Sequence, residues 1–197
     1  MKTNTSRLIL SAVLIGSITI GTQSCKSKKT VAQTTGAVEI TVPFNTNEFS
    51  SDKDNFRARA SGNSPDLTTA KKIALQNAKS EMAGLIQTTI KKVTDQYTNQ
   101  RTVGSTQEFS NKFEELAREV TNQQLTDVRI IGEKIFQEKN TTYTYWIAIE
   151  ANKQTVYDGV TKSVSKDKKL EQDYDKKKFE DIFNQEIEKL AKEKAGN

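Results

Sequence analysis

Apolar residues are distributed along this chain with two periods, and each period predicts a type of secondary structure. Where apolar and polar residues alternate, side chains point to opposite faces of an extended strand. Such alternation predicts four strands, over residues 38–44, 56–60, 128–136 and 143–149. It shifts at Gly132, which indicates a β-bulge. The last two strands are expected to form an antiparallel hairpin, and residues 61–63 (Ser-Gly-Asn) are expected to form a turn.

A long helix is predicted between residues 64 and 97, where apolar residues recur three and four positions apart. Ser64 suits the N-cap and Pro65 the first helical position, so the helix is expected to begin there. Gly84 lowers the helix propensity of this segment and is expected to mark a close contact. The buried stripe is predicted to contain Leu67, Ala70, Ile73, Ala74, Ala78, Met82, Leu85, Ile86, Thr89, Ile90 and Val93.

Three further helical stripes follow the same rule. Residues 105–124 predict a second helix, and the chain becomes helical again after residue 152, with a densely charged stretch over residues 166–178. The residues expected to be buried are Phe109, Phe113, Leu116, Ala117 and Val120, then Val156, Tyr157, Val160 and Val164, and finally Phe179, Ile182, Phe183, Ile187, Leu190 and Ala191.

Together these elements predict an α+β fold, in which two long helices pack an antiparallel sheet of three to four strands. An additional charged C-terminal helix follows. Along the chain we expect a leader over residues 1–24, a tether over residues 25–37, an α/β domain over residues 38–151, and amphipathic charged helices over residues 152–197.

The leader contains an uncharged run over residues 8–20, preceded by Lys2 and Arg7. This run is shorter than the ~20 residues that span a bilayer, and it has the length of a signal-peptide core. Small and polar residues then lead to Cys25, the only cysteine of the chain. The arrangement resembles the lipobox of bacterial lipoproteins, in which the signal is cut before the cysteine and acyl chains such as palmitate are attached to it. An ordinary cleaved signal with a free thiol, and an uncleaved anchor, are the alternatives.

The net charge and the residues that follow Cys25 bear on the expected partners and location of the protein. The formal net charge of +5 falls to +3 without Lys2 and Arg7, and no basic stripe with interleaved aromatic residues occurs, so nucleic acid is not an expected partner. By resemblance to known sorting patterns, Lys26 is not the aspartate that retains lipoproteins in the inner membrane. No acidic cluster follows Cys25, as it does in surface-exported lipoproteins. The expected address is the outer membrane, facing the periplasm.

Three segments of the mature chain resemble one protein family. They are Arg57-Ala58-Arg59-Ala60-Ser61-Gly62, the helix with Ala70, Ala74 and Ala78, and Tyr143-Thr144-Tyr145-Trp146-Ile147-Ala148. In this order they resemble the Lpp-twenty-type bacterial outer-membrane lipoproteins, over about residues 55–151. The resemblance implies a small α/β domain in an envelope protein, and it implies no catalytic residue.

The amino-acid composition gives little indication of a catalytic site. The chain has no histidine, which excludes Ser–His and Cys–His schemes and the commonest metal ligand. The glycines are isolated, so no phosphate-binding loop is expected, and acidic pairs such as Glu114 and Glu115 lie in charged helical stretches without the spacing of a calcium loop. We therefore expect no catalytic residue, no metal site and no cofactor, and the protein is not expected to be an enzyme.

One group of residues is a candidate binding site. Trp146 lies on the strand face opposite Tyr145, and Arg57 and Arg59 are expected near it on a neighbouring strand. A tryptophan beside arginines can stack on a planar or anionic ligand. The family fold has been likened to the flavin-binding dodecins, which use a tryptophan. Alternatively, Trp146 packs under the C-terminal helix or against a dimer partner.

Two functions are therefore expected from the sequence. The first is a non-enzymatic structural or protein-interaction module, attached to the membrane through acylated Cys25, whose partners are other envelope proteins or copies of itself. The second is a lipoprotein that binds a small ligand, such as a flavin or a cell-wall fragment, at Trp146.

Overall fold

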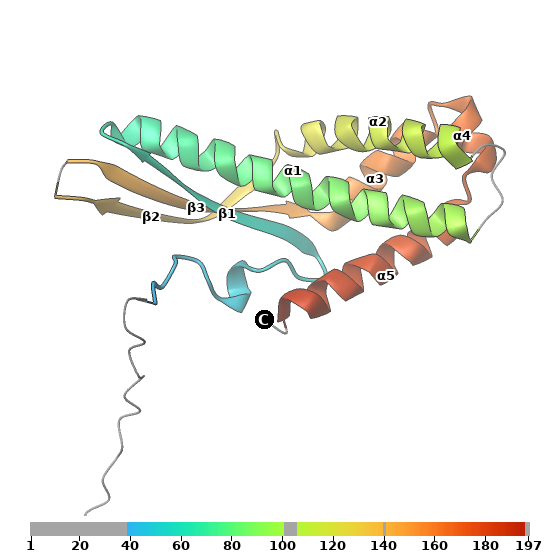
Figure 1. The fold of residues 1–197 in the computed structure, drawn as a ribbon. Coiled ribbons are helices and arrows are strands. Elements are labelled where there is room, and N and C mark those ends of the chain that lie inside the picture. Colours follow the sequence, from blue (N-terminus) through green and yellow to red (C-terminus); the bar gives the residue numbers. More distant parts are fainter. Residues whose placement is uncertain (1–38, 101–105, 140, 196–197) are drawn as a thin grey trace, which may run out of the picture. The chain divides into compact units, whose positions relative to one another are not determined.

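The computed structural model describes residues 39–100, 106–139 and 141–195. Within them, β1 (Asn55–Ser64), β2 (Arg129–Gln137) and β3 (Tyr143–Asn152) form an antiparallel sheet in the order β1-β3-β2. The helices are α1 (Leu67–Asn99), α2 (Thr106–Gln124), α3 (Lys153–Val164), α4 (Lys168–Asp173) and α5 (Lys176–Ala195), and a 3-10 helix, η1 (Asn47–Phe49), precedes β1. The predicted α+β class is confirmed (Figure 1).

The described helices and strands belong to a single compact unit that begins at Ile40. The helices α3, α4 and α5 lie within this unit, together with the sheet. The predicted signal peptide, the tether and Cys25 lie outside the described residues. Among the helices that are described, none combines the length and the apolar composition needed to cross a membrane.

The first half of α1 covers one face of the sheet, and its second half continues past the sheet among the other helices (Figure 1). The helix begins two residues later than predicted, because Ser64 still belongs to β1 and Asp66 is the N-cap. The Asp66 carboxylate accepts a hydrogen bond of 2.7 Å from the Thr69 backbone N–H. The buried face is as predicted from Ala70 to Val93, but Leu67 and Ile73 are each 38% exposed because they lie to the side of the sheet contact.

Gly62 makes that sheet contact possible. The prediction of a turn over residues 61–63 was wrong, because β1 continues straight through them beneath the start of α1. A Cβ atom on Gly62 would lie 2.4 Å from the Ala74 nitrogen and 2.5 Å from the Ala70 oxygen. The glycine and the two small helical residues therefore let the helix backbone approach the strand directly.

Gly84 plays no such part, so the expectation of a close contact there was wrong. A Cβ atom at this position of α1 would meet no other atom within 4 Å. The close contact is instead made earlier in the same helix, at Ala70 and Ala74, opposite Gly62.

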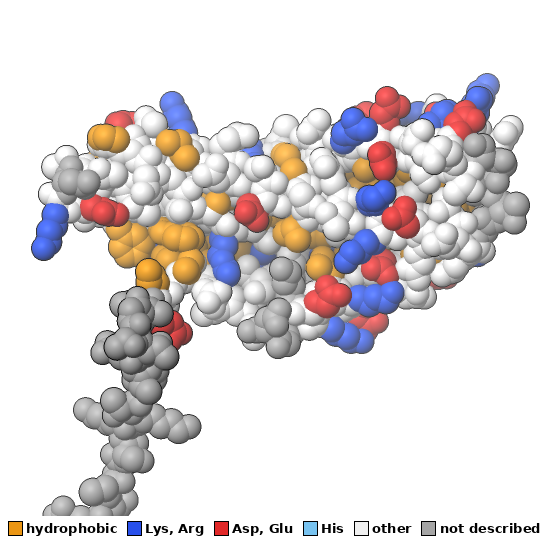
Figure 2. Space-filling model, in the orientation of Figure 1, with side chains coloured by type: hydrophobic (Ala, Val, Ile, Leu, Met, Phe, Trp, Pro, Cys, Tyr) orange, Lys and Arg blue, Asp and Glu red, His pale blue; other side chains and the backbone are white. Residues whose placement is uncertain are grey.

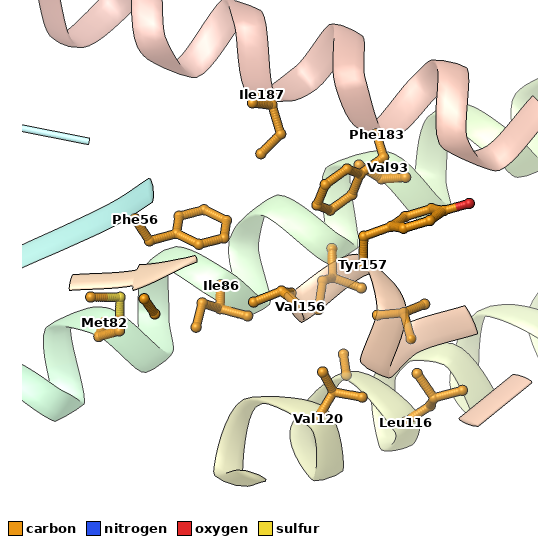
Figure 3. Packing of buried hydrophobic residues seen from close by; sticks show 14 of the residues in the cluster. Phe56, Met82, Ile86, Val93, Leu116, Val120, Val156, Tyr157, Phe183 and Ile187 are labelled. Carbon is orange, nitrogen blue, oxygen red and sulfur yellow. The ribbon is translucent and has the colours of Figure 1, made fainter. Parts of the chain in front are cut away.

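The remaining helices complete the core on the second half of α1. The stripe of α2 that contains Phe113 and Val120 is buried as predicted and packs against α1 and α3. Phe183 and Ile187 of α5 point towards Val93 of α1 and Phe56 at the start of β1 (Figure 3). The charged C-terminal helix is therefore part of the same core as the sheet.

The β2–β3 hairpin is formed as predicted, with a register shift between Ile130 and Gly132. This shift confirms the β-bulge that the change in alternation at Gly132 indicated. It leaves Ile131 without a directly opposite partner on β3.

Candidate functional site

The face of the sheet opposite α1, here called the outer face, carries the residues that the sequence singled out. Trp146 pairs with Ser61 of β1, and Arg57 and Arg59 lie further along β1 on the same face. Tyr145, its neighbour in the sequence, is buried on the opposite face, beneath α1. Trp146 and the two arginines therefore share this face, with Arg57 four residues along β1 from the partner of Trp146.

Arg57 is fully occupied by contacts within the chain. Its guanidinium donates to Glu150 at 3.0 Å, to the Ser50 carbonyl at 2.9 Å, and forms an ion pair with Asp52 at 2.7 Å. Arg129 of β2 binds the other oxygen of Glu150, which is only 6% exposed. Burial acts against the charged form of Arg57, but the bond to Glu150 and the charge of Asp52 outweigh it and raise the pKa of Arg57. This cluster stabilises the sheet and does not offer a free cation to a ligand.

Arg59 binds the segment that precedes β1. It donates to the Phe44 carbonyl and, at 2.7 Å, to the Asn45 side chain. Phe44 has a φ angle of 61° and its buried ring lies over Gly132 of β2, where a Cβ atom would be 2.6 Å from the ring. The Phe49 ring packs against it in a tilted arrangement, with 4.7 Å between ring centroids. The outer face is therefore partly covered by the chain's own residues 43–50.

The strand predicted over residues 38–44 is not formed within its described part, residues 39–44. The left-handed backbone at Phe44 ends any extended run there. Ile40, within the predicted strand, is 79% exposed. The alternating pattern was present, but no strand pairs with this segment.

A groove of about 830 Å³ lies beside β1 and brings two of the three candidate residues together. Trp146 and Arg59 line it, together with Asn77 and Lys92 of α1 and Leu190 of α5. Arg57 does not take part. Trp146 is half-buried, and the C-terminal helix supplies one wall, which partly agrees with the expectation that Trp146 packs under that helix.

The two edges of the sheet differ, and sequence reasoning did not anticipate this difference. Along β1, the Ser51 hydroxyl bonds to both backbone groups of Arg57, and Asn77 donates to the Ser61 carbonyl at 2.9 Å. The Asn55 carbonyl accepts from the Asp52 N–H. The edge of β1 is thus largely closed to another strand.

The edge formed by β2 is open. Among the described residues, none donates to or accepts from the outward backbone groups of residues 129–137. The side chains of this strand are also exposed, at 40% for Ile130, 51% for Ile135 and 48% for Phe136. Hydrophobic side chains gather by the β2–β3 hairpin on the face shown in Figure 2. A long edge strand with exposed apolar residues is typical of a surface that pairs with another chain.

Lys153, at the start of α3, is a buried cation that sequence reasoning also missed. The residue is 2% exposed, its ammonium donates to the Asp52 carbonyl, and it lies 4.9 Å from the centre of the Phe56 ring. Burial lowers the pKa of Lys153 to about 8, although the charges of Asp52 and Asp54 oppose this shift. Nothing in the sequence around this lysine, which follows the N-cap Asn152, indicates that its side chain is buried.

The burial of Lys153 predicts that stability rises with pH. Between pH 8 and 10.5 the unfolded chain holds a proton on this lysine that the folded chain has lost, so the free energy of unfolding increases with pH. We expect a gain of about 1–2 kcal/mol between pH 7.5 and 9.5 in urea unfolding at fixed ionic strength. Lys153→Met should abolish the rise. A flat or falling profile for the wild-type chain over this interval would contradict the assignment.

No group of three or more histidine, cysteine, aspartate or glutamate residues that could hold a metal ion occurs in the described part of the chain. Comparisons with protein-family models, with curated proteins and with solved structures find no match to this chain. What can be inferred about function therefore rests on the residues and geometry of the chain itself.

Proposed function

We propose that this chain is a lipid-anchored envelope protein whose folded unit acts as a non-enzymatic module for binding other proteins. One observation carries the binding role: the open edge of β2, with Ile130, Ile135 and Phe136 exposed along it. Monomeric proteins usually protect such edges with charges, prolines or covering segments. Here the side chains of Ser51 and Asn77 cover the edge of β1. Along β2 only charged residues such as Lys134 and the bulge at Ile131 protect the edge, beside the three exposed apolar residues, which favours a contact at β2.

The lipid anchor is supported by the sequence. The uncharged run, the small residues after it and the single Cys25 have the order of a lipoprotein signal, and the resemblance to Lpp-twenty-type proteins points to the same class. Several acyl chains on Cys25 would give a stable anchor where one chain would be marginal. The address that this pattern favours is the periplasmic side of an outer membrane.

Replacement of the anchor residue tests this part of the proposal. We expect Cys25→Ala to leave an uncleaved precursor and to change the membrane association of the protein, as followed by fractionation and immunoblotting. Inhibition of signal peptidase II should give the same precursor. The control is Ser24→Ala, which keeps a small residue before the cysteine and should be processed normally. Unchanged processing and fractionation of Cys25→Ala would refute the anchor.

Crosslinking in cells tests the binding role. A photo-crosslinking amino acid at position 136 of the full chain should give discrete adducts with proteins. The matched control is position 73, because Ile73 is also a partly exposed apolar residue but lies on α1. Equal adducts from both positions, or none from position 136, would argue against an interface at β2.

The groove beside β1 supports a second candidate function, the binding of a small planar or anionic ligand. Its lining combines the Trp146 ring with the cations of Arg59 and Lys92 and the amide of Asn77. Stacking on the ring and contacts to the cations suit a flavin or a cell-wall fragment. Titration of Trp146 fluorescence, the only tryptophan of the chain, with both ligand classes tests this candidate. No saturable change with either class would count against it.

A further inference from the structure

The hydrogen bonds of β1 determine which backbone groups are available at the open edge of β2. In an antiparallel ladder, the backbone groups of alternate residues point to the same side of a strand. Backbone groups of Asn55, Arg57 and Ser61 bond to partners on the side away from β3. The backbone groups that bond to β3 are therefore those of the even-numbered residues of β1, and these residues pair with odd-numbered residues of β3. The backbone N–H and C=O groups of the even-numbered residues of β3 must then point to β2.

The register between β2 and β3 completes this deduction. Trp146 and Thr144 of β3 face Lys134 and Phe136 of β2, so the backbone groups of those β2 residues are turned inward. The N–H and C=O groups of Glu133, Ile135 and Gln137 are therefore turned outward, to the open edge. Three alternate residues with unpaired backbone groups form a template for one more antiparallel strand.

We propose that this strand is β2 of a second copy of the same chain, paired about a two-fold axis at Ile135. Two identical antiparallel strands related by a two-fold axis place one residue opposite its own copy, and the charges along β2 restrict which residue this can be. An axis at Glu133 brings two carboxylates directly opposite each other, and an axis at Lys134 brings two ammonium groups together. Like charges in directly opposite positions are destabilising.

The axis at Ile135 avoids both conflicts and gives favourable pairs. Ile135 lies opposite Ile135 of the second copy, so two exposed apolar side chains cover each other. Lys134 lies opposite Phe136 of the second copy, which places a cation beside an aromatic ring. Glu133 lies opposite Gln137 of the second copy, where the amide can donate to the carboxylate.

Other positions of the axis fit the strand less well. An axis nearer Arg129 takes the pairing through the bulge at Ile131, where the alternation of faces is interrupted. An axis at Phe136 takes it past the end of β2 at Gln137, so that only residues 135–137 of each strand pair within β2. The axis at Ile135 keeps residues 133–137 of each strand in regular pairing and places no like charges opposite each other.

The proposed pairing is compatible with a lipid anchor on both chains. Only this point rests on the proposed function. A two-fold axis perpendicular to the sheet keeps the outer faces of both copies on the same side. Phe44, which packs on the outer face at Gly132, then lies on that same side in each copy. With the proposed anchor, attachment of both copies to one membrane raises their effective concentration.

Cysteine crosslinking of the purified full chain tests the axis position. Residues in a hydrogen-bonded antiparallel pair have Cα atoms about 5.5 Å apart, which a disulfide can bridge. In a Cys25→Ser background at about 100 μM, a concentration suited to a small interface, Ile135→Cys should form a disulfide-linked dimer on mild oxidation. On a non-reducing gel this species runs at twice the 22.1 kDa of the chain.

Two matched variants separate this register from random collision. Gln137→Cys is four residues from its own copy in the proposed register, about 13 Å away, and should not self-link. A mixture of Gln137→Cys with Glu133→Cys should link, because these positions are opposite each other. Ile73→Cys, which is exposed on α1, should stay monomeric.

The outcomes distinguish the dimer from the proposed function. A monomeric Ile135→Cys chain, or equal linking of Ile73→Cys, overturns the dimer, and adducts of position 136 with a different protein would then still support a binding module. Sedimentation provides a second measurement. Ile135→Lys, at a half-exposed site, should keep the circular dichroism of the wild type and lose self-association, and a wild-type chain that is monomeric at 100 μM also overturns the dimer.

Discussion

Replacing Gly62 by alanine is expected to lower the free energy of unfolding by about 3 kcal/mol or more. The added Cβ atom would lie 2.4 Å from the Ala74 nitrogen and 2.5 Å from the Ala70 oxygen. Both are backbone atoms of α1, so relief requires the helix to move away from β1 rather than a side chain to rotate. Overpacking of a core by single methyl groups costs about 1–3 kcal/mol, and a clash with rigid backbone lies at the upper end or above it. Chemical unfolding followed by circular dichroism measures the loss.

Gly84→Ala is the matched control for this prediction. It adds the same methyl group to a glycine, but at a position of α1 where no other atom lies within 4 Å. Alanine is the better helix former by about 1 kcal/mol, so this variant should be more stable than the wild type. If both variants lost stability equally, the assignment of the close contact to Gly62 would be wrong.

Arg57→Met is expected to cost about 3 kcal/mol. The Glu150 carboxylate is buried, and Arg57 is its well-shielded partner, with a side chain that is 15% exposed. Removal of one member of a buried ion pair typically costs about 3–5 kcal/mol. The lower end is expected here, because the exposed Arg129 still binds the other oxygen of Glu150. Arg57 also holds Asp52 and the Ser50 carbonyl, so the segment before β1 should loosen at the same time. Hydrogen exchange over residues 43–54 would detect this loosening.

Arg129→Met tests whether exposure decides the effect. Arg129 binds the same carboxylate of Glu150, but its side chain is 75% exposed, so water can replace it. The expected loss is below about 1 kcal/mol, the usual range for a surface pair. A cost for Arg129→Met equal to that for Arg57→Met would show that both arginines are equally needed to neutralise Glu150.

Most helices and strands could be predicted from the sequence, because their apolar residues recur with the period of a helix or of a strand. The apolar residues of α2 recur at helical spacing from Phe109 to Val120, and a single face of a regular helix can bury all of them. The β2–β3 hairpin was predictable for the same reason, since alternation over both strands and a short turn leave few other pairings. Even the bulge was visible, as a shift in alternation at Gly132.

The predictions failed where a residue's role depends on a partner that is distant in the sequence. Gly62 was assigned to a turn and Gly84 to a close contact. In the structure Gly62 is the crowded glycine and Gly84 is not, because the packing of α1 on β1 decides which glycine is enclosed. Residues 39–44 carry a strand-like alternation, but the left-handed backbone at Phe44 and the packing of its ring over Gly132 place this residue on a face of the sheet and not along an edge. Ile73 fits the helical stripe, but it is 38% exposed.

The candidate site was anticipated in part. Alternation alone placed Trp146 on the face opposite Tyr145, and the pairing with β1 brought Arg57 and Arg59 to that face. The sequence could not indicate that Arg57 would be occupied by Glu150, which lies 93 residues away. It also could not indicate that β2 would be an edge strand, since strand order is a property of the assembled sheet.

The sequence by itself determined the helical stripes, the hairpin and the absence of histidine, because these follow from residue types and short periods. The prediction of a leader that ends before Cys25 also rests on the sequence alone. Only the tertiary structure decided which sheet edge is closed by Ser51 and Asn77 and which remains open at β2. The physical reason is that backbone hydrogen bonds are local in helices and hairpins, whereas the satisfaction of an edge strand depends on segments that folding brings to it.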